Sequence, residues 1–158
     1  MSVTSALRLA EIDTVIAIKE ESGDVQWFRA FMAAQRKASP NHRLAGICGG
    51  EGLFPYYAME GASAFSTGAV NLVPNLSTAM WHAVTTSDRT RINAIQEQLA
   101  PLTSLRSKPG RSIPVIKEGL RQLGVFSTNA CRPPLTELPV SECAEMEAIL
   151  QAWRYVGI

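Results

Sequence analysis

Three short apolar segments, each followed by a helical pattern, recur about every 25 residues in the first half of the chain. The predicted strands cover residues 14–19, 43–48 and 63–67. The helical stretches after them run from Asp24, a good N-cap, to the break at Ser39-Pro40, then over 53–59, then onward from Leu76. Strand–helix units of this length are typical of parallel strands joined by right-handed crossovers. The sequence therefore predicts an α/β fold.

The second half of the chain is predicted to be helical, because no strand pattern follows Thr86. Amphipathic helices are predicted over 89–105, 113–123 and 141–155. The breaks between them are Lys108-Pro109-Gly110 and Cys131-Arg132-Pro133-Pro134, and Ser112 is a plausible N-cap. We therefore expect strand–helix units at 1–85 and a helical region of the same domain at 86–158.

Length, composition and charge limit the kinds of protein that this chain can be. A chain of 158 residues with 46% hydrophobic and 18% charged residues fits one soluble domain with a sizeable core. The formal net charge is +1, and the basic residues form no stripe along the sequence. The sequence therefore does not predict a basic surface for binding nucleic acid or an anionic membrane. No apolar stretch approaches the roughly 20 residues of a membrane span, and the N-terminus lacks a secretory pattern. A cytoplasmic protein acting on small molecules is expected.

The cysteines indicate neither a disulfide framework nor a zinc site. Cys48, Cys131 and Cys143 are odd in number and widely spaced, and only His42 and His82 accompany them. Three free thiols, buried or partly buried in a reducing compartment, are predicted.

Lys19 is the candidate catalytic residue, because the first strand carries it to its C-terminal end. Alternation puts Val15, Ala17 and Lys19 on one face of that strand. Apolar surroundings disfavour an ammonium, and the neutral amine is the form that attacks a ketone to give a Schiff base. The alternative is an ordinary strand-end lysine that reaches water along its alkyl stem.

The other two strands also end in residues suited to a small-molecule site. Cys48-Gly49-Gly50-Glu51 ends the second strand, and Ser66-Thr67-Gly68 ends the third. Parallel α/β sheets place their chemistry at these ends, and glycine lets the backbone approach a ligand closely. Taken singly, each of these motifs is also compatible with a plain turn.

Taken together, the motifs resemble the dihydrodipicolinate synthase / N-acetylneuraminate lyase family. The resemblance rests on Ile18-Lys19-Glu20-Glu21-Ser22-Gly23-Asp24, Gly49-Gly50-Glu51-Gly52 and the block from Gly61 to Pro74, and continues through Pro114–Gly124 and Cys131–Thr136. It runs from about Leu7 to Trp153 and implies a class I aldolase-type lyase on a TIM (β/α)8 barrel. Within this family Phe65-Ser66-Thr67-Gly68 favours a sugar-acid branch over lysine biosynthesis.

The resemblance also implies residue roles. Lys19 matches the lysine of the sixth strand, which forms an imine with pyruvate or another 2-oxo acid. Gly49 and Gly50 match the substrate-contacting end of the seventh strand, and Ser66, Thr67 and Gly68 match the eighth. The protonated imine then serves as the electron sink for aldol cleavage, condensation or dehydration, with no metal or organic cofactor.

The resemblance covers only strands six to eight and the C-terminal helical region, whereas a full barrel takes about 250 residues. The family's carboxylate-gripping segment and proton-relaying tyrosine come from earlier strands, so Tyr56, Tyr57 and Tyr155 receive no role. A truncated gene, a late start or a fragment would each give such a chain. Three strands would leave open edges and an unpacked face that includes Val15 and Ala17.

Two interpretations follow from the partial match. One is a Schiff-base lyase that works with a complementing N-terminal half or as a homo-oligomer, so that the isolated chain is inactive. The other is a catalytically inactive half-barrel remnant or partner-binding fragment that has kept Lys19 by descent.

Overall fold

The computed structural model describes residues 1–37 and 43–155. The chain divides into two compact units, Met1–Thr67 and Gly68–Ile158. The sequence-based division at 85/86 instead groups the helix after Leu76 with the strands. Ser39-Pro40, the predicted helix stop, and His42 lie outside the described residues.

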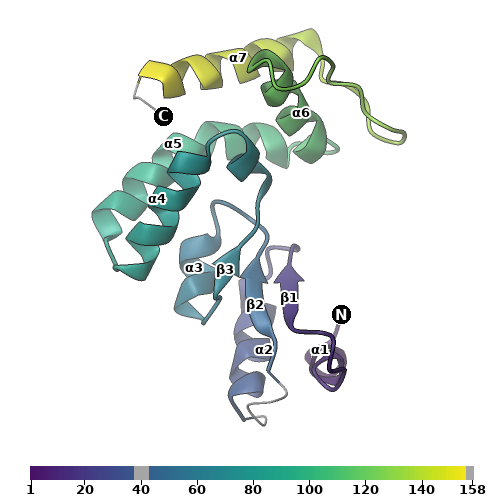
Figure 1. Cartoon of the computed structure of the whole chain (residues 1–158), viewed down its shortest axis with the longest axis vertical. Coiled ribbons are helices and arrows are strands. Elements are labelled where there is room, and N and C mark those ends of the chain that lie inside the picture. The colour runs from purple at the N-terminus through teal and green to yellow at the C-terminus, as the bar shows by residue number, and fades with distance from the viewer. Residues whose placement is uncertain (38–42, 156–158) are drawn as a thin grey trace. The chain divides into compact units, whose positions relative to one another are not determined.

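The first unit is built on a parallel sheet of β1 (Ala17–Glu20), β2 (Ala45–Cys48) and β3 (Ala64–Phe65), in that order (Figure 1). The register pairs Ala17 with Ala45 and Glu20 with Cys48, and then Cys48 with Phe65. The predicted α/β class and parallel pairing are confirmed. The strands are shorter than predicted, and β1 begins at Ala17 rather than at Thr14.

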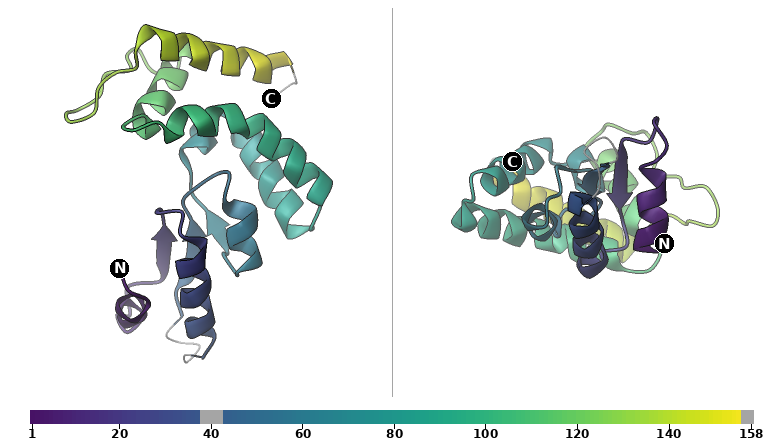
Figure 2. Two further views of the ribbon diagram at one scale, coloured as in Figure 1. Left: turned by 180° about the vertical axis from the view of Figure 1, so that it is seen from behind. Right: turned by 90° about the horizontal axis from the view of Figure 1, so that it is seen from below.

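Two helices cover one face of this sheet, α2 (Val25–Lys37) and α3 (Phe54–Met59) (Figures 1 and 2). Asp24 caps α2 as predicted, because its Oδ1 accepts a hydrogen bond of 2.8 Å from the Trp27 amide. Phe28 of α2 packs so closely on β2 that a Cβ at Gly46 would lie 2.5 Å from its Cζ. The glycine is what lets the helix approach the strand.

A helix that the sequence analysis did not predict, α1 (Val3–Leu9), opens the chain. Ser2 caps it by accepting a hydrogen bond of 3.1 Å from the Ser5 amide. The small side chains of Ala6 and Ala10 form a core cluster with Phe31 and Leu44, and Val15 packs against that cluster. The expectation that Val15 belongs to an unpacked strand face is therefore wrong, because the residue precedes β1 and finds its partners at α1.

The second unit is helical, as predicted for most of its length. A short 3-10 turn, η2 (Gly68–Asn71), leads into α4 (Pro74–Thr85), α5 (Arg89–Ser107), α6 (Ser112–Gln122) and α7 (Val140–Tyr155). Buried side chains from all four helices form its core, among them Met80, Leu102, Val115 and Met146. Ser112 is the first residue of α6 rather than its cap, and its Oγ accepts a hydrogen bond of 3.1 Å from Arg106 Nη2.

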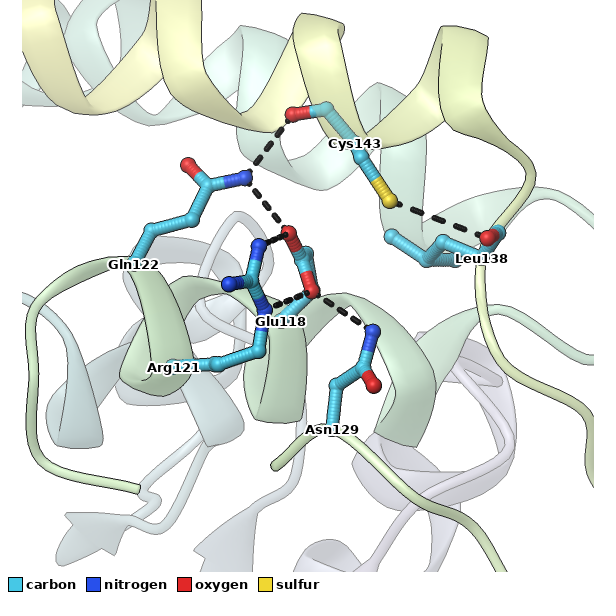
Figure 3. A network of polar contacts seen from close by, with 6 residues as sticks. All are labelled: Glu118, Arg121, Gln122, Asn129, Leu138 and Cys143. Carbon is cyan, nitrogen blue, oxygen red and sulfur yellow. Dashed lines mark hydrogen bonds and ion pairs between the residues drawn. The ribbon is translucent and has the colours of Figure 1, made fainter. Parts of the chain in front are cut away.

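A buried carboxylate holds α6 to the segments that follow it (Figure 3). Glu118, with no exposed surface, accepts hydrogen bonds from Arg121 at 2.7 and 2.9 Å, from Gln122 at 2.7 Å and from Asn129 at 2.7 Å. Gln122 also donates to the Cys143 carbonyl of α7 at 2.9 Å. Arg121 above all lowers the pKa of Glu118 to about 2, against the opposing effect of burial, and Gln122 and Asn129 add to the lowering.

Cys48, Cys131 and Cys143 are free thiols, the first buried and the others half-buried, as expected. Among the described residues, no helix combines the length and the hydrophobicity that crossing a bilayer requires.

Candidate active site

The carboxyl ends of the three strands lie side by side in the first unit. Glu20, Cys48 and Phe65 are aligned across the sheet. Beyond them the Gly49 amide donates a hydrogen bond of 2.8 Å to the Glu20 carbonyl, and the Ser66 amide donates one of 2.9 Å to the Cys48 carbonyl. The backbone therefore brings the ends that carry Lys19, Gly49 and Ser66 to one edge of the sheet, where α/β folds place their sites.

Lys19 lies on the face of the sheet opposite to α2, because its neighbour Ile18 pairs with Gly46, which faces Phe28 of that helix. Its cross-strand neighbour is Ile47, which pairs in turn with Ala64, and both of these are half-buried. These two cross-strand neighbours are apolar. The lysine itself is not desolvated, because its side chain is 42% exposed and its Nζ lies 2.7 Å from Glu21 Oε2. In the first unit the amine therefore reaches water, which is the alternative considered from the sequence.

Glu21 connects Lys19 to the Gly49 backbone. A Cβ built on Gly49 would lie 2.5 Å from Glu21 Oε2 and 2.7 Å from the Glu20 carbonyl oxygen. The carboxylate of Glu21 thus occupies the space directly over Gly49 while it pairs with the lysine. Only glycine fits at position 49 with this arrangement.

Glu20, the next residue after Lys19, is the anchor of the loop. Its side chain is buried and accepts hydrogen bonds from the Ser22 amide at 2.7 Å, from the Ser22 hydroxyl, from the Gly23 amide at 3.1 Å and from the Tyr57 hydroxyl of α3. Burial opposes ionisation, but the hydrogen bonds from Ser22, Tyr57 and Gly23 outweigh it, so the pKa of Glu20 is lowered. Burial and the bond to Glu20 raise the pKa of Tyr57.

The remaining predicted site residues differ in their surroundings. The Gly50 carbonyl accepts from the Cys48 thiol at 3.3 Å, and burial raises the pKa of that thiol to about 11. Ser66 is exposed, whereas the Thr67 hydroxyl is buried and has no hydrogen-bond partner among the described residues. Gly68 begins the second unit, where a Cβ on it would lie 2.8 Å from Arg106 Nη2.

A hollow of about 260 Å³ adjoins the end of β1, and Lys19, Glu20 and Trp27 are among its lining residues. The Trp27 indole N–H is buried without a hydrogen-bond partner in the described part of the chain. Across residues 1–37 and 43–155, no His, Cys, Asp and Glu side chains gather in a group that could hold a metal ion.

Sequence reasoning did not assign a role to Glu20, Glu21 or Tyr57. The sequence did contain a signal for the two glutamates, because Glu20 and Glu21 directly follow Lys19. Carboxylates so close to a lysine in sequence can form an ion pair with it. Tyr57 lies 37 residues away from Glu20 and gave no such signal.

Comparison with known proteins identifies the kind of chain to which this site belongs. The model of the dihydrodipicolinate synthetase family matches residues 1–153. A curated protein of Oceanobacillus iheyensis, named "Probable 5-dehydro-4-deoxyglucarate dehydratase", is 27% identical over 154 residues. A protein of the same name from Bradyrhizobium diazoefficiens is 34% identical over 99 residues, or 61% of this chain and 31% of that protein.

Solved structures agree with this comparison. The crystal structure of dihydrodipicolinate synthase from Oceanobacillus iheyensis superposes with a TM-score of 0.86 at 29% identity, covering 98% of this chain and 51% of that one. The corresponding synthase from Bacillus clausii gives a TM-score of 0.86 at 27% identity, with 98% and 52% coverage. The chain spans about half the length of the proteins it matches, 49% in the case of the curated Oceanobacillus relative, while 96% of its own length is aligned there.

Proposed function

Because the chain belongs to the dihydrodipicolinate synthetase family, we propose that it carries the Schiff-base half of a lyase, with Lys19 as the nucleophile. The Lys19 amine attacks the carbonyl carbon of pyruvate or another 2-oxo acid, water leaves, and a protonated imine forms. That imine accepts the electron pair of a breaking C–C or C–H bond. The observation that carries the proposal is the alignment of the Lys19 strand end with those of Gly49 and Ser66.

We assign substrate-binding roles to five residues that follow the ends of β2 and β3. Gly49 and Gly50 at the end of β2, and Ser66, Thr67 and Gly68 after β3, would contact the 2-oxo acid. The buried hydroxyl of Thr67, which has no hydrogen-bond partner among the described residues, supports this assignment, because a buried donor without a partner is costly unless a ligand satisfies it.

Dehydration of a sugar-derived 2-oxo acid is the reaction that we favour within this class. The curated relatives from Oceanobacillus and Bradyrhizobium carry the name of a 5-dehydro-4-deoxyglucarate dehydratase. The Phe65-Ser66-Thr67-Gly68 segment favoured the same sugar-acid branch. Aldol cleavage or condensation would use the same imine.

We further propose the architectural setting in which this chemistry operates. β1, β2 and β3 would be strands six to eight of a (β/α)8 barrel in the cytoplasm, with strand–helix units at 1–85 and the C-terminal helical region at 86–158. The face of Lys19 would then turn toward the barrel interior. A complementing N-terminal half would supply the earlier strands, or a second copy of the chain would cover the open edges of the sheet.

Borohydride trapping tests the proposal. The purified chain is incubated with pyruvate and reduced, and the adduct is located by peptide mass spectrometry, with Lys19→Ala as the control. The same reaction is repeated with a fragment that covers the first half of the Oceanobacillus relative. An adduct confined to Lys19, in either reaction, supports the proposal.

Two results would contradict it. Labelling of Lys37, Lys108 and Lys117 at the same level as Lys19 would show that the site adds nothing to ordinary lysine reactivity. No adduct in either reaction would favour a catalytically inactive half-barrel.

A further inference from the structure

We propose that Glu21 sets the affinity of the site for anionic substrates, because its carboxylate is paired with the amine that a 2-oxo acid must reach. The proposal rests on the function proposed above. Glu21 Oε2 lies 2.7 Å from Lys19 Nζ, and it would lie 2.5 Å from a Cβ on Gly49. The carboxylate therefore stands between the proposed nucleophile and the proposed substrate-contacting backbone.

Covalent geometry brings the substrate carboxylate close to Glu21. In an imine of a 2-oxo acid, the carbon bonded to Nζ also bears the carboxylate, so that carboxylate lies next to the nitrogen. Two negatively charged carboxylates beside one nitrogen repel each other, and the repulsion grows as the distance between them shrinks. We therefore expect an incoming 2-oxo acid to compete with Glu21 for Lys19.

The loop geometry explains why Glu21 is held in this place. The buried carboxylate of Glu20 is bound by the backbone amides of Ser22 and Gly23 and by the hydroxyl of Tyr57. These contacts fix the turn on the C-terminal side of Glu21, and the Gly49 amide fixes the Glu20 carbonyl on the other side at 2.8 Å. The side chain of Glu21 projects from a backbone that is anchored on both sides.

Exposure argues against a different role for this carboxylate. The Glu21 side chain is 65% exposed, so it stays hydrated while it pairs with Lys19. Catalytic electrostatic interactions are strongest where water is excluded, and this exposed carboxylate does not lie in such a site. Competition with an anionic substrate needs only charge and position, and Glu21 has both.

The test compares Glu21→Gln with the unaltered chain in borohydride trapping. Pyruvate is one probe and acetone, a ketone without a carboxylate, is the other. We expect Glu21→Gln to raise the ratio of the pyruvate to the acetone trapping rate at Lys19, by up to about 5-fold for an exposed charge pair. The half-saturating pyruvate concentration should fall while the maximal rate stays the same. Glu97→Gln, an exposed substitution on α5 with the same change in net charge, serves as the control.

The outcomes separate this inference from the proposed function. Lys19 adducts with an unchanged pyruvate-to-acetone ratio would overturn the role of Glu21 and leave the Schiff-base proposal intact. A lower ratio in Glu21→Gln would show that Glu21 assists the reaction and would also overturn it. No Lys19 adduct with either ketone in any variant would overturn the Schiff-base proposal and, with it, the inference.

Discussion

The hydroxyl of Tyr57 donates a hydrogen bond to the buried carboxylate of Glu20, the residue next to Lys19. Tyr57 is 1% exposed and belongs to α3, so the bond ties the loop after β1 to the helix after β2. Two neighbouring strand–helix units are thus joined by a hydrogen bond to the residue that follows the candidate nucleophile. A buried charge held in this way is costly to leave without its donors.

Tyr57→Phe should destabilise the protein, because it removes a donor from a buried carboxylate without changing the aromatic packing. We expect the free energy of unfolding to fall by about 1–3 kcal/mol in urea denaturation. Tyr56→Phe is the matched control, since Tyr56 is 52% exposed and its substitution should cost less than about 0.5 kcal/mol. Equal stabilities of the two variants would contradict the importance of the Glu20 anchor.

Gly49→Ala should be damaging and Gly50→Ala nearly neutral. At Gly49 the new Cβ would meet the Glu20 carbonyl oxygen at 2.7 Å, so the backbone itself must move, whereas at Gly50 the nearest atom is 3.5 Å away. We expect Gly49→Ala to lower the free energy of unfolding by about 1–3 kcal/mol and Gly50→Ala to leave it within about 0.5 kcal/mol. Thermal and urea unfolding measure the difference, and a reversed order would show that the crowding at Gly49 is relieved at little cost.

Acid should destabilise the second unit through Glu118. The pKa of this carboxyl is lowered from 4.5 to about 2, chiefly by Arg121, so the folded state favours the ionised form. Its contribution to stability is complete above about pH 4.5 and is lost as the pH falls toward 2, an effect on the order of 3 kcal/mol. Urea unfolding at pH 7, 4 and 3 measures it.

Glu118→Gln isolates this contribution from other carboxylates. The variant should be less stable than the unaltered chain at pH 7, and the gap should narrow as the pH falls, because the unaltered chain then loses the same charge. The exposed Glu97→Gln should leave the pH dependence unchanged. A gap that stays constant from pH 7 to 3 would show that Glu118 contributes through packing and not through its charge.

The isolated chain should self-associate. In the described residues β1 pairs only with β2, and β3 pairs only with β2, so both edges of the sheet carry unpaired backbone groups. Ile16, at the start of the β1 edge, is 77% exposed. Sedimentation velocity over a concentration range should reveal oligomers, and an N-terminal fragment of the Oceanobacillus relative should compete with them.

Ile16→Lys is the control for this prediction, because a charge at an edge strand opposes pairing with another chain. The substitution should reduce association without loss of core packing. A monodisperse monomer with a cooperative thermal transition at all concentrations would contradict the prediction.

Much of the fold could be predicted because it follows from local patterns. Alternation and helical spacing located the three strands and the long helices, and Asp24 capped its helix as expected. Helix α1 escaped prediction, because its apolar face rests on two alanines, Ala6 and Ala10, whose burial depends on Phe31 and Leu44. Ser112 was misplaced by one residue, since its hydroxyl bonds to Arg106 and caps no helix.

The sequence by itself determined which residues reach the carboxyl edge of the sheet, because strand ends and glycine turns are set by the backbone pattern around each residue. It therefore placed Lys19, Gly49 and Ser66 at three neighbouring ends, and it carried enough family motifs to identify the class of chain. Only the tertiary structure decided the electrostatic surroundings of the lysine. Its exposure, its pairing with Glu21 and the anchoring of Glu20 by Tyr57 depend on contacts between side chains brought together by folding, and charge interactions depend on distance in space.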